Sequence, residues 1–177
     1  MPSLIYAAST CSYADFLQVY RPADAPHLDS SGRTLLFESV TNKDIQARVA
    51  ITNRLLDDGA DPAVVSRGIN VLHVLFGTRR HETELEAPML RRLIDGGADI
   101  NQVSKRSGPP LAVLIEHGPS PEVERVPFYD VIFDQPNLDL SAPCLRGTLH
   151  DLIFDSVWNF PILRERAAAY EAARSTA

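Results

Sequence analysis

Apolar residues in this chain recur in short runs that have the three- and four-residue spacing of one helix face. Four such runs begin at a leucine that closely follows a glycine, and these leucines lie 36, 39 and 38 residues apart. They are Leu36, Leu72, Leu111 and Leu149. A second apolar run follows the first three, within residues 51–56, 89–94 and 128–133. The pattern predicts a series of paired helices.

The second run of each pair ends in a recurring phrase. Residues 55–61 are Leu-Leu-Asp-Asp-Gly-Ala-Asp, residues 93–99 are Leu-Ile-Asp-Gly-Gly-Ala-Asp, and a degenerate copy occupies residues 132–139. Gly59 and Gly97 fall just after the last apolar pair, where a left-handed C-terminal cap favours a residue without a Cβ atom. Because the two phrases keep the same period, the chain is predicted to consist of stacked repeats.

These phrases resemble those of the ankyrin repeat family. The family's Thr-Pro-Leu-His phrase is matched loosely at residues 34–37, 70–73, 109–112 and 147–150, and its Leu-Leu-x-x-Gly-Ala-Asp phrase is matched closely at 55–61 and 93–99. The resemblance covers residues 28–166 and implies an all-α solenoid of about four helix-turn-helix units with capping helices at both ends. We therefore expect a single domain over residues 1–177. It divides into an N-terminal cap at 1–27 and repeats at about 28–65, 66–103, 104–141 and 142–177.

The units depart from the family pattern in three respects. They are longer than the family's ~33 residues, and the extra length lies between the paired helices, near 41–48, 77–86 and 118–125. The third unit has Pro136 where the others have glycine, so its second helix is expected to end irregularly. The fourth unit has no Gly-Ala-Asp phrase, as expected of a terminal repeat whose outer side faces water.

The two ends of the chain are predicted to cap the stack. Residues 4–20 should form one capping helix or two short ones, and residues 164–177 should finish the last helix. Trp158 and Phe160 form either a plug in the core under the last unit or an exposed anchor, and the plug is favoured because an exposed aromatic pair would promote association.

The composition limits the class of partner that the chain can bind. Of the 177 residues 45% are hydrophobic, which is enough for a core, and the net charge is −6. This charge argues against nucleic acid and anionic membranes, and no apolar run approaches the ~20 residues of a membrane span. The N-terminus lacks the positive charge of a secretory signal, and two scattered cysteines suit a reducing compartment. We expect a cytoplasmic protein that is monomeric when free.

Candidate chemistry is sparse. His73 and His150 occupy the helix-start phrase, where the resemblance implies hydrogen bonds to neighbouring backbone within the stack. The repeated aspartates point to turns and helix ends, and no histidine pair has the spacing of a zinc site. No cofactor and no catalytic residue is expected. A remote alternative is an enzyme or small-ligand protein that uses the loops between paired helices. Its residues would be His81, Glu82, Glu84 and Glu86.

The resemblance instead places function on the concave side, at the turns between units and the solvent side of the first helices. The expected contact residues are Arg33, Glu38, Asn42, Arg67, Val74, Thr78, Lys105, Arg106, Glu116, His117, Arg146, Asp151 and Asp155, with Thr41 and Val113 on the same helix sides. The arginines and the lysine line the turn tips, and the carboxylates lie along the helices.

A small acidic chain of this kind resembles bacterial ankyrin proteins that act as immunity proteins against toxins. The expectation is a non-catalytic protein that occludes a toxin through its concave face, with net charge favouring encounter with a basic partner surface. The alternative within the same class is a scaffold or effector that binds another protein, including a host protein.

Overall fold

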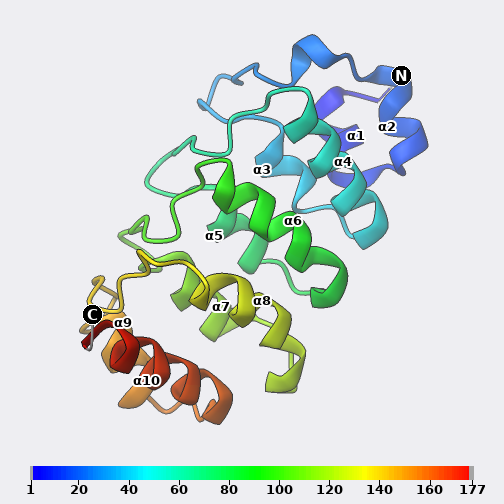
Figure 1. Ribbon diagram of the computed structural model, residues 1–177. Coiled ribbons are helices and arrows are strands. Elements are labelled where there is room, and N and C mark those ends of the chain that lie inside the picture. The colour runs from blue at the N-terminus through cyan, green and yellow to red at the C-terminus, as the bar shows by residue number, and fades with distance from the viewer. Residues whose placement is uncertain (1, 176–177) are drawn as a thin grey trace.

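The computed structural model describes residues 2–175, and its regular elements are helices, with no strand among these residues. The α-helices lie in two rows (Figure 1). The first row contains α1 (Leu4–Thr10), α3 (Leu36–Ser39), α5 (Val71–Phe76), α7 (Pro110–His117) and α9 (Leu149–Phe154). The second row contains α2 (Tyr13–Val19), α4 (Ile45–Asp57), α6 (Thr83–Asp95), α8 (Val126–Phe133) and α10 (Pro161–Ser175). Two short 3-10 helices, η1 (Pro22–Asp24) and η2 (Glu122–Arg125), complete the described part of the chain.

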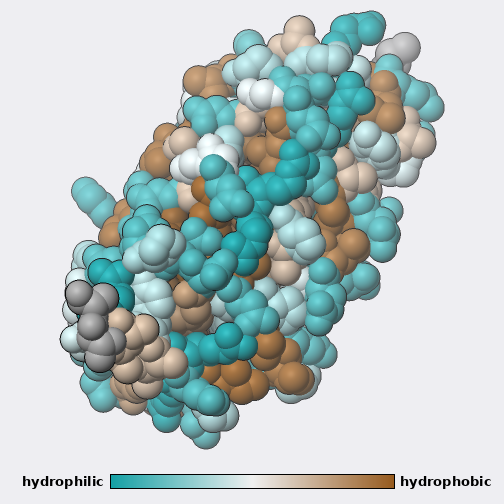
Figure 2. All heavy atoms as spheres, viewed as in Figure 1, coloured by the Kyte–Doolittle hydropathy of each residue, from teal (hydrophilic) through white to brown (hydrophobic). Residues whose placement is uncertain are grey.

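Each helix packs against the next helix of its own row, so the pairs follow one another along the stack. Helices α1 and α10 lie at opposite ends of this stack (Figure 1). Among the described residues, no helix is both long enough and apolar enough to cross a membrane. The face drawn in Figure 2 is a mosaic in which hydrophilic residues separate the hydrophobic ones.

The hydrophobic seam runs between the two rows. Leu36, Leu72, Leu111 and Leu149 are all fully buried and belong to one core cluster, which confirms the prediction from their spacing. Residues from the second row, including Ile51, Leu90 and Phe128, complete the same cluster. Because no unit buries its apolar face alone, stability depends on contacts between neighbouring units.

Helix ends follow the predicted signals in two of the three units. At α4 the N–H groups of Gly59 and Ala60 bind the carbonyls of Leu56 and Leu55, with Gly59 at φ 91°, and α6 ends in the same way at Gly97. These two hydrogen bonds satisfy carbonyls that a helix end leaves free. The third unit has no glycine here, and α8 ends irregularly at Phe133, as predicted.

The two chain ends differ in how well the sequence predicts them. Residues 4–20 form two short helices, α1 and α2. The prediction that Trp158 fills the core is wrong, because its side chain is 39% exposed and stacks on Phe160 in the loop between α9 and α10. Phe160 is half-buried. The core under the last unit is filled by Ile153 and Leu163 instead.

Candidate functional site: a groove between the turn tips and the first row of helices

A groove of about 920 Å³ lies between the turns that join units and the exposed sides of α5 and α7. It brings together six of the contact residues predicted from the sequence, which are Arg33, Arg67, Val74, Lys105, Arg106 and His117. The rest of its lining comes from Gly68, Ile69, His73, Gly77, Val103, Ser104, Ser107 and Val113. Its volume lies near the upper end of the ~300–1,000 Å³ range of ligand pockets.

The turns that form one side of the groove are built alike. Two of them close with a short backbone bridge, between Ser66 and Ile69 and between Ser104 and Gly108, and the turn beyond the groove closes in the same way between Pro143 and Thr148. Side chains tie one turn to the next, since the Ser66 hydroxyl donates to the Ser31 carbonyl at 2.8 Å. The turn tips therefore form a fixed row beside the helices.

His73 links the helix side of the groove to the turn side. It is nearly buried, and its Nε2 atom lies 3.0 Å from the Gly108 carbonyl oxygen of the next unit. Burial lowers the pKa of His73 below its ordinary value, and the Gly108 carbonyl partly opposes this effect. The predicted structural role of His73 is confirmed.

His150 does not share that role. Its ring packs against Phe154, with a centroid distance of 4.6 Å, and its Nε2 atom lies 3.7 Å from a Glu171 carboxylate oxygen. The expectation of a hydrogen bond from its side chain to backbone within the stack is wrong. The reason is its place in α9, because the residues that the structure describes beyond it form α10 and offer no turn carbonyl like that of Gly108.

The charge of the groove has one sign. Arg33, Arg67, Lys105 and Arg106 line it, and no aspartate or glutamate does. In the part of the chain that the structure describes, none of these four cations forms an ion pair with a carboxylate. The guanidinium of Arg33 instead lies over the Phe37 ring at 5.3 Å.

The remaining predicted contact residues lie outside the groove. Glu116, Arg146 and Asp155 are exposed. The Thr78 hydroxyl donates to the Leu75 carbonyl at 2.9 Å and so is used within its own loop. Asp151 caps α9, where the backbone N–H and the hydroxyl of Thr148 hold its pKa below the ordinary value.

The placement of Asn42 on the solvent side is wrong. Its side chain is fully buried, and its amide donates to the carbonyls of Ala8 at 3.1 Å and Cys11 at 3.0 Å. It thereby binds the end of α1 to the loop after α3. Helical periodicity could not predict this, because α3 ends at Ser39 and the chain has already turned at residue 42.

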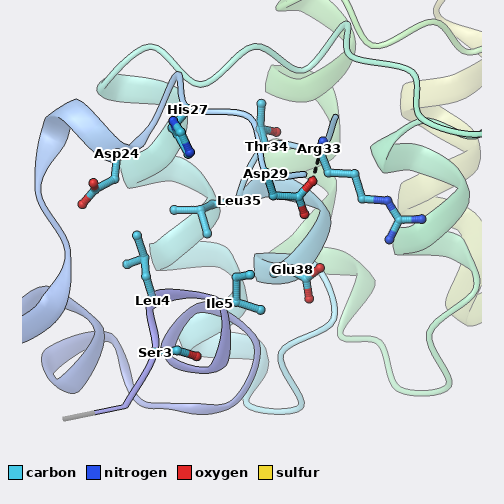
Figure 3. Close-up of a pocket in the computed structure, with 10 residues that line it drawn as sticks. All are labelled: Ser3, Leu4, Ile5, Asp24, His27, Asp29, Arg33, Thr34, Leu35 and Glu38. Atoms are coloured by element: carbon cyan, nitrogen blue, oxygen red, sulfur yellow. Dashed lines mark hydrogen bonds between the residues drawn. The ribbon is translucent and has the colours of Figure 1, made fainter. Parts of the chain in front are cut away.

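Glu38 belongs to a second, smaller pocket of about 280 Å³ between α1 and the linker that follows η1 (Figure 3). Leu4, Ile5 and Leu35 supply apolar lining, and Arg33 is shared with the groove. The Asp29 carboxylate accepts hydrogen bonds from the backbone N–H groups of Ser31 and Arg33 at this edge. The pocket lies at the N-terminal end of the groove.

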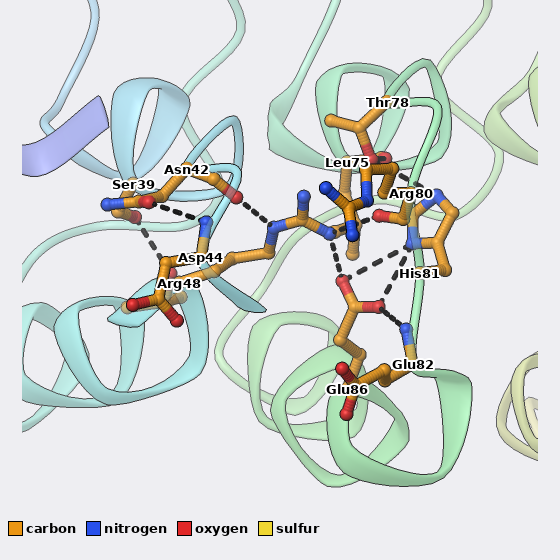
Figure 4. A network of polar contacts seen from close by, with 11 residues as sticks. Ser39, Asn42, Asp44, Arg48, Leu75, Thr78, Arg80, His81, Glu82 and Glu86 are labelled. Carbon is orange, nitrogen blue, oxygen red and sulfur yellow. Dashed lines mark hydrogen bonds and ion pairs between the residues drawn. The ribbon is translucent and has the colours of Figure 1, made fainter. Parts of the chain in front are cut away.

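The inter-helix loops, which held the candidate residues for an enzyme, contain a polar network (Figure 4), and His81, Glu82 and Glu84 also line a pocket of about 510 Å³ there. Glu86 is fully buried, and its carboxylate binds the Arg48 guanidinium at 2.5 Å and the Glu82 N–H at 2.8 Å. His81 Nδ1 lies 3.1 Å from the same carboxylate. Glu86 and Arg48 therefore hold neighbouring units together, while Glu82 and Glu84 are exposed.

Cys144 does not have the surroundings of an activated nucleophile. Burial raises the pKa of the Cys144 thiol to about 11, which is opposite to the shift that generates a reactive thiolate. Within the described residues, no group of three His, Cys, Asp or Glu side chains is placed to hold a metal ion.

Arg67 is the one groove residue with an unusual backbone conformation. Among the described residues other than glycine, it alone has a positive φ, at 53°, and Gly68 follows at 82°. Positive φ at both central residues defines the tight hairpin turn that favours Asn-Gly. Arginine is therefore an unfavourable choice for the fold at this position, and it places a cation at the edge of the groove.

We expect Arg67→Asn to raise the free energy of unfolding by about 1 kcal/mol, because asparagine tolerates the left-handed region better than arginine. Urea unfolding measures the effect. Arg106→Asn is the matched control, since Arg106 also lies at a turn tip but has no positive φ, and it should leave stability within about 0.5 kcal/mol of the original. Equal effects of the two substitutions would contradict the explanation.

Sequence reasoning named Val74 and Val113 but missed two other apolar residues of the groove, Ile69 and Val103. Val103 directly precedes the third turn and lines the wall, as Ile69 does within the second. Neither residue belongs to a charged turn tip or to a helix face, so neither is among the predicted contacts. The sequence does contain one indication of them, because each is an apolar residue at or beside a turn, where exposure to water usually favours a polar residue.

Comparison with known proteins shows the fold alone. Neither protein-family models nor curated proteins give a match to this sequence. Among solved structures, the chain is similar to the crystal structure of a functionally unknown protein from Leptotrichia buccalis C-1013-b, with a TM-score of 0.77 and 21% sequence identity. The similarity covers 98% of this chain and 94% of the other.

Proposed function

We propose that the protein is an ankyrin-type solenoid that binds another protein through the groove, without catalysis, and acts by occlusion. The repeated phrases and the two rows of stacked helices support the ankyrin assignment. The observation that carries the function is the convergence of six predicted contact residues on one groove of about 920 Å³. Such a surface is how stacked repeats usually contact their partners.

Within this class we propose an immunity or inhibitor protein whose partner is a toxin domain. A rigid groove with fixed turn tips suits occlusion, because a preorganised surface loses little conformational entropy on binding. The net charge of −6 would favour encounter with a partner of positive net charge. A scaffold or effector would use the same groove on a different partner.

The test is co-expression, in the cytoplasm of a host cell, with the products of the genes that flank this one. We expect one of them to inhibit growth alone and to be neutralised in a stoichiometric complex. Val74→Arg, which places a long cation on the helix side of the groove, should lower affinity for that partner by about tenfold or more. Val157→Arg is the control, since Val157 is 94% exposed and lies far along the chain from the groove residues.

Two results would contradict the proposal. One is the absence of any complex with a flanking gene product or with a protein from the source cell. The other is a complex that Val74→Arg and Val157→Arg affect equally, with both variants folded by circular dichroism, because the contact surface would then lie elsewhere.

A further inference from the structure

The cations of the second row and those of the groove differ in their partners. On the second row, arginines pair with aspartates of neighbouring units, as Arg92 does with Asp57 at 2.6 Å and Arg91 with Asp134 at 2.8 Å. In the groove, the four cations Arg33, Arg67, Lys105 and Arg106 have no such carboxylate in the described part of the chain. A chain with an excess of acidic residues therefore places these four unpaired cations along one groove.

The lining of the groove also includes apolar residues. Ile69, Val74 and Val103 are partly exposed within it, and Val113 contributes from α7. Guanidinium groups bind carboxylates through two parallel hydrogen bonds, a geometry that ammonium groups and neutral partners do not reproduce. A complementary ligand carries carboxylates at its edges and an apolar side chain between them.

We infer that the groove binds an acidic, extended segment of the partner protein, with at least two carboxylates that flank an apolar side chain. This inference rests on the groove being the partner-binding surface proposed above. The carboxylates contact Arg67, Lys105 and Arg106, and the apolar side chain contacts the apolar lining. A polypeptide is favoured over nucleic acid because the net charge of −6 repels a polyanion while a short segment meets only the local positive charge.

The experiment selects binders from a displayed library of random nine-residue peptides on the immobilised full chain. We expect enrichment of Asp and Glu on both sides of an apolar residue. The strongest peptide, fluorescently labelled, then gives affinities by anisotropy. Its amide version, with Gln and Asn in place of Glu and Asp, should bind about tenfold or more weakly.

Two double variants separate local from net charge. Lys105→Glu with Arg106→Glu removes cations from the groove, and Lys43→Glu with Arg79→Glu makes the same change in net charge at exposed residues outside it. We expect the first to lower affinity for the acidic peptide by about tenfold or more and the second to change it by less than about twofold. Circular dichroism checks that both variants are folded.

Each other outcome overturns the inference. In the selection, these outcomes are enrichment of basic or wholly apolar peptides, or no enrichment at all. In the binding assays, they are equal weakening by both double variants, or tighter binding of a single-stranded oligonucleotide than of the acidic peptide. Failure of the proposed function is distinguishable, because it appears as the absence of a complex in co-expression. If a toxin complex forms and is unaffected by Lys105→Glu with Arg106→Glu, the proposed function stands and the inference of an acidic segment is refuted.

Discussion

Glu86→Ala is expected to lower the free energy of unfolding by about 3–5 kcal/mol, the range found when one partner of a buried ion pair is removed. Both side chains are essentially inaccessible, with Arg48 at 2% and Glu86 at 0%. Without the carboxylate, the Arg48 guanidinium stays buried with only the Asn42 and Arg80 carbonyls as acceptors. Because Arg48 lies in α4 and Glu86 in α6, the loss falls on the interface between two neighbouring units.

Urea unfolding followed by circular dichroism measures this change. Arg92→Ala is the matched control, because it breaks the ion pair between Arg92 and Asp57, which joins the same two helices. The two side chains are 43% and 60% exposed, so the substitution should lower the free energy of unfolding by less than about 1 kcal/mol. A double variant, Arg48→Met with Glu86→Leu, should recover much of the lost stability, since it leaves no charge unpaired. A loss below about 1 kcal/mol for Glu86→Ala would show that the network contributes little to holding the units together.

The periodic part of this fold is predictable from the sequence because periodicity reflects burial directly. The four leucines align in one seam, and the glycines at positions 59 and 97 end their helices as expected. The repeat spacing also reveals the extra length between paired helices, but it does not reveal what that length contains. A buried arginine or glutamate gives no periodic signal, since its burial depends on which carbonyls and carboxylates the loops bring within reach.

The candidate site is predictable in outline and not in its charge. Turn positions follow from the helix-start phrases, so the sequence alone places Arg33, Arg67, Lys105 and Arg106 at the turn tips. Their segregation from the carboxylates does not follow, because it depends on how Glu38, Asp151 and the other acidic side chains are positioned in space. Glu38 lies in the smaller pocket, and Asp151 caps a helix.

Arg125→Ala is the second substitution with a large expected effect, a loss of about 2–4 kcal/mol in the free energy of unfolding. Arg125 is 4% exposed, and its guanidinium donates to the carbonyls of Leu114, Ile115, Gly118 and Pro119 at 2.7–3.1 Å. The Leu114 carbonyl also accepts the Gly118 N–H, and the other three carbonyls lie at and beyond the end of α7, where helical bonding leaves carbonyls free. The same guanidinium lies over the Phe160 ring at 4.2 Å and so fixes the start of α10.

The measurement combines urea unfolding with amide hydrogen exchange. Arg166→Ala is the matched control, since Arg166 pairs with Asp130 at 40% and 52% exposure and should contribute less than about 1 kcal/mol. Arg125→Lys tests the geometry, because an ammonium group cannot reach all four carbonyls from one position, and it should retain less than half of the contribution. Exchange should accelerate around residues 115–125 and at the start of α10, where the arginine joins one loop to the next helix pair. If Arg125→Ala and Arg166→Ala differ by less than about 0.5 kcal/mol, the carbonyls at the end of α7 are satisfied by water once the arginine is removed, and Arg125 contributes little to holding the last units together.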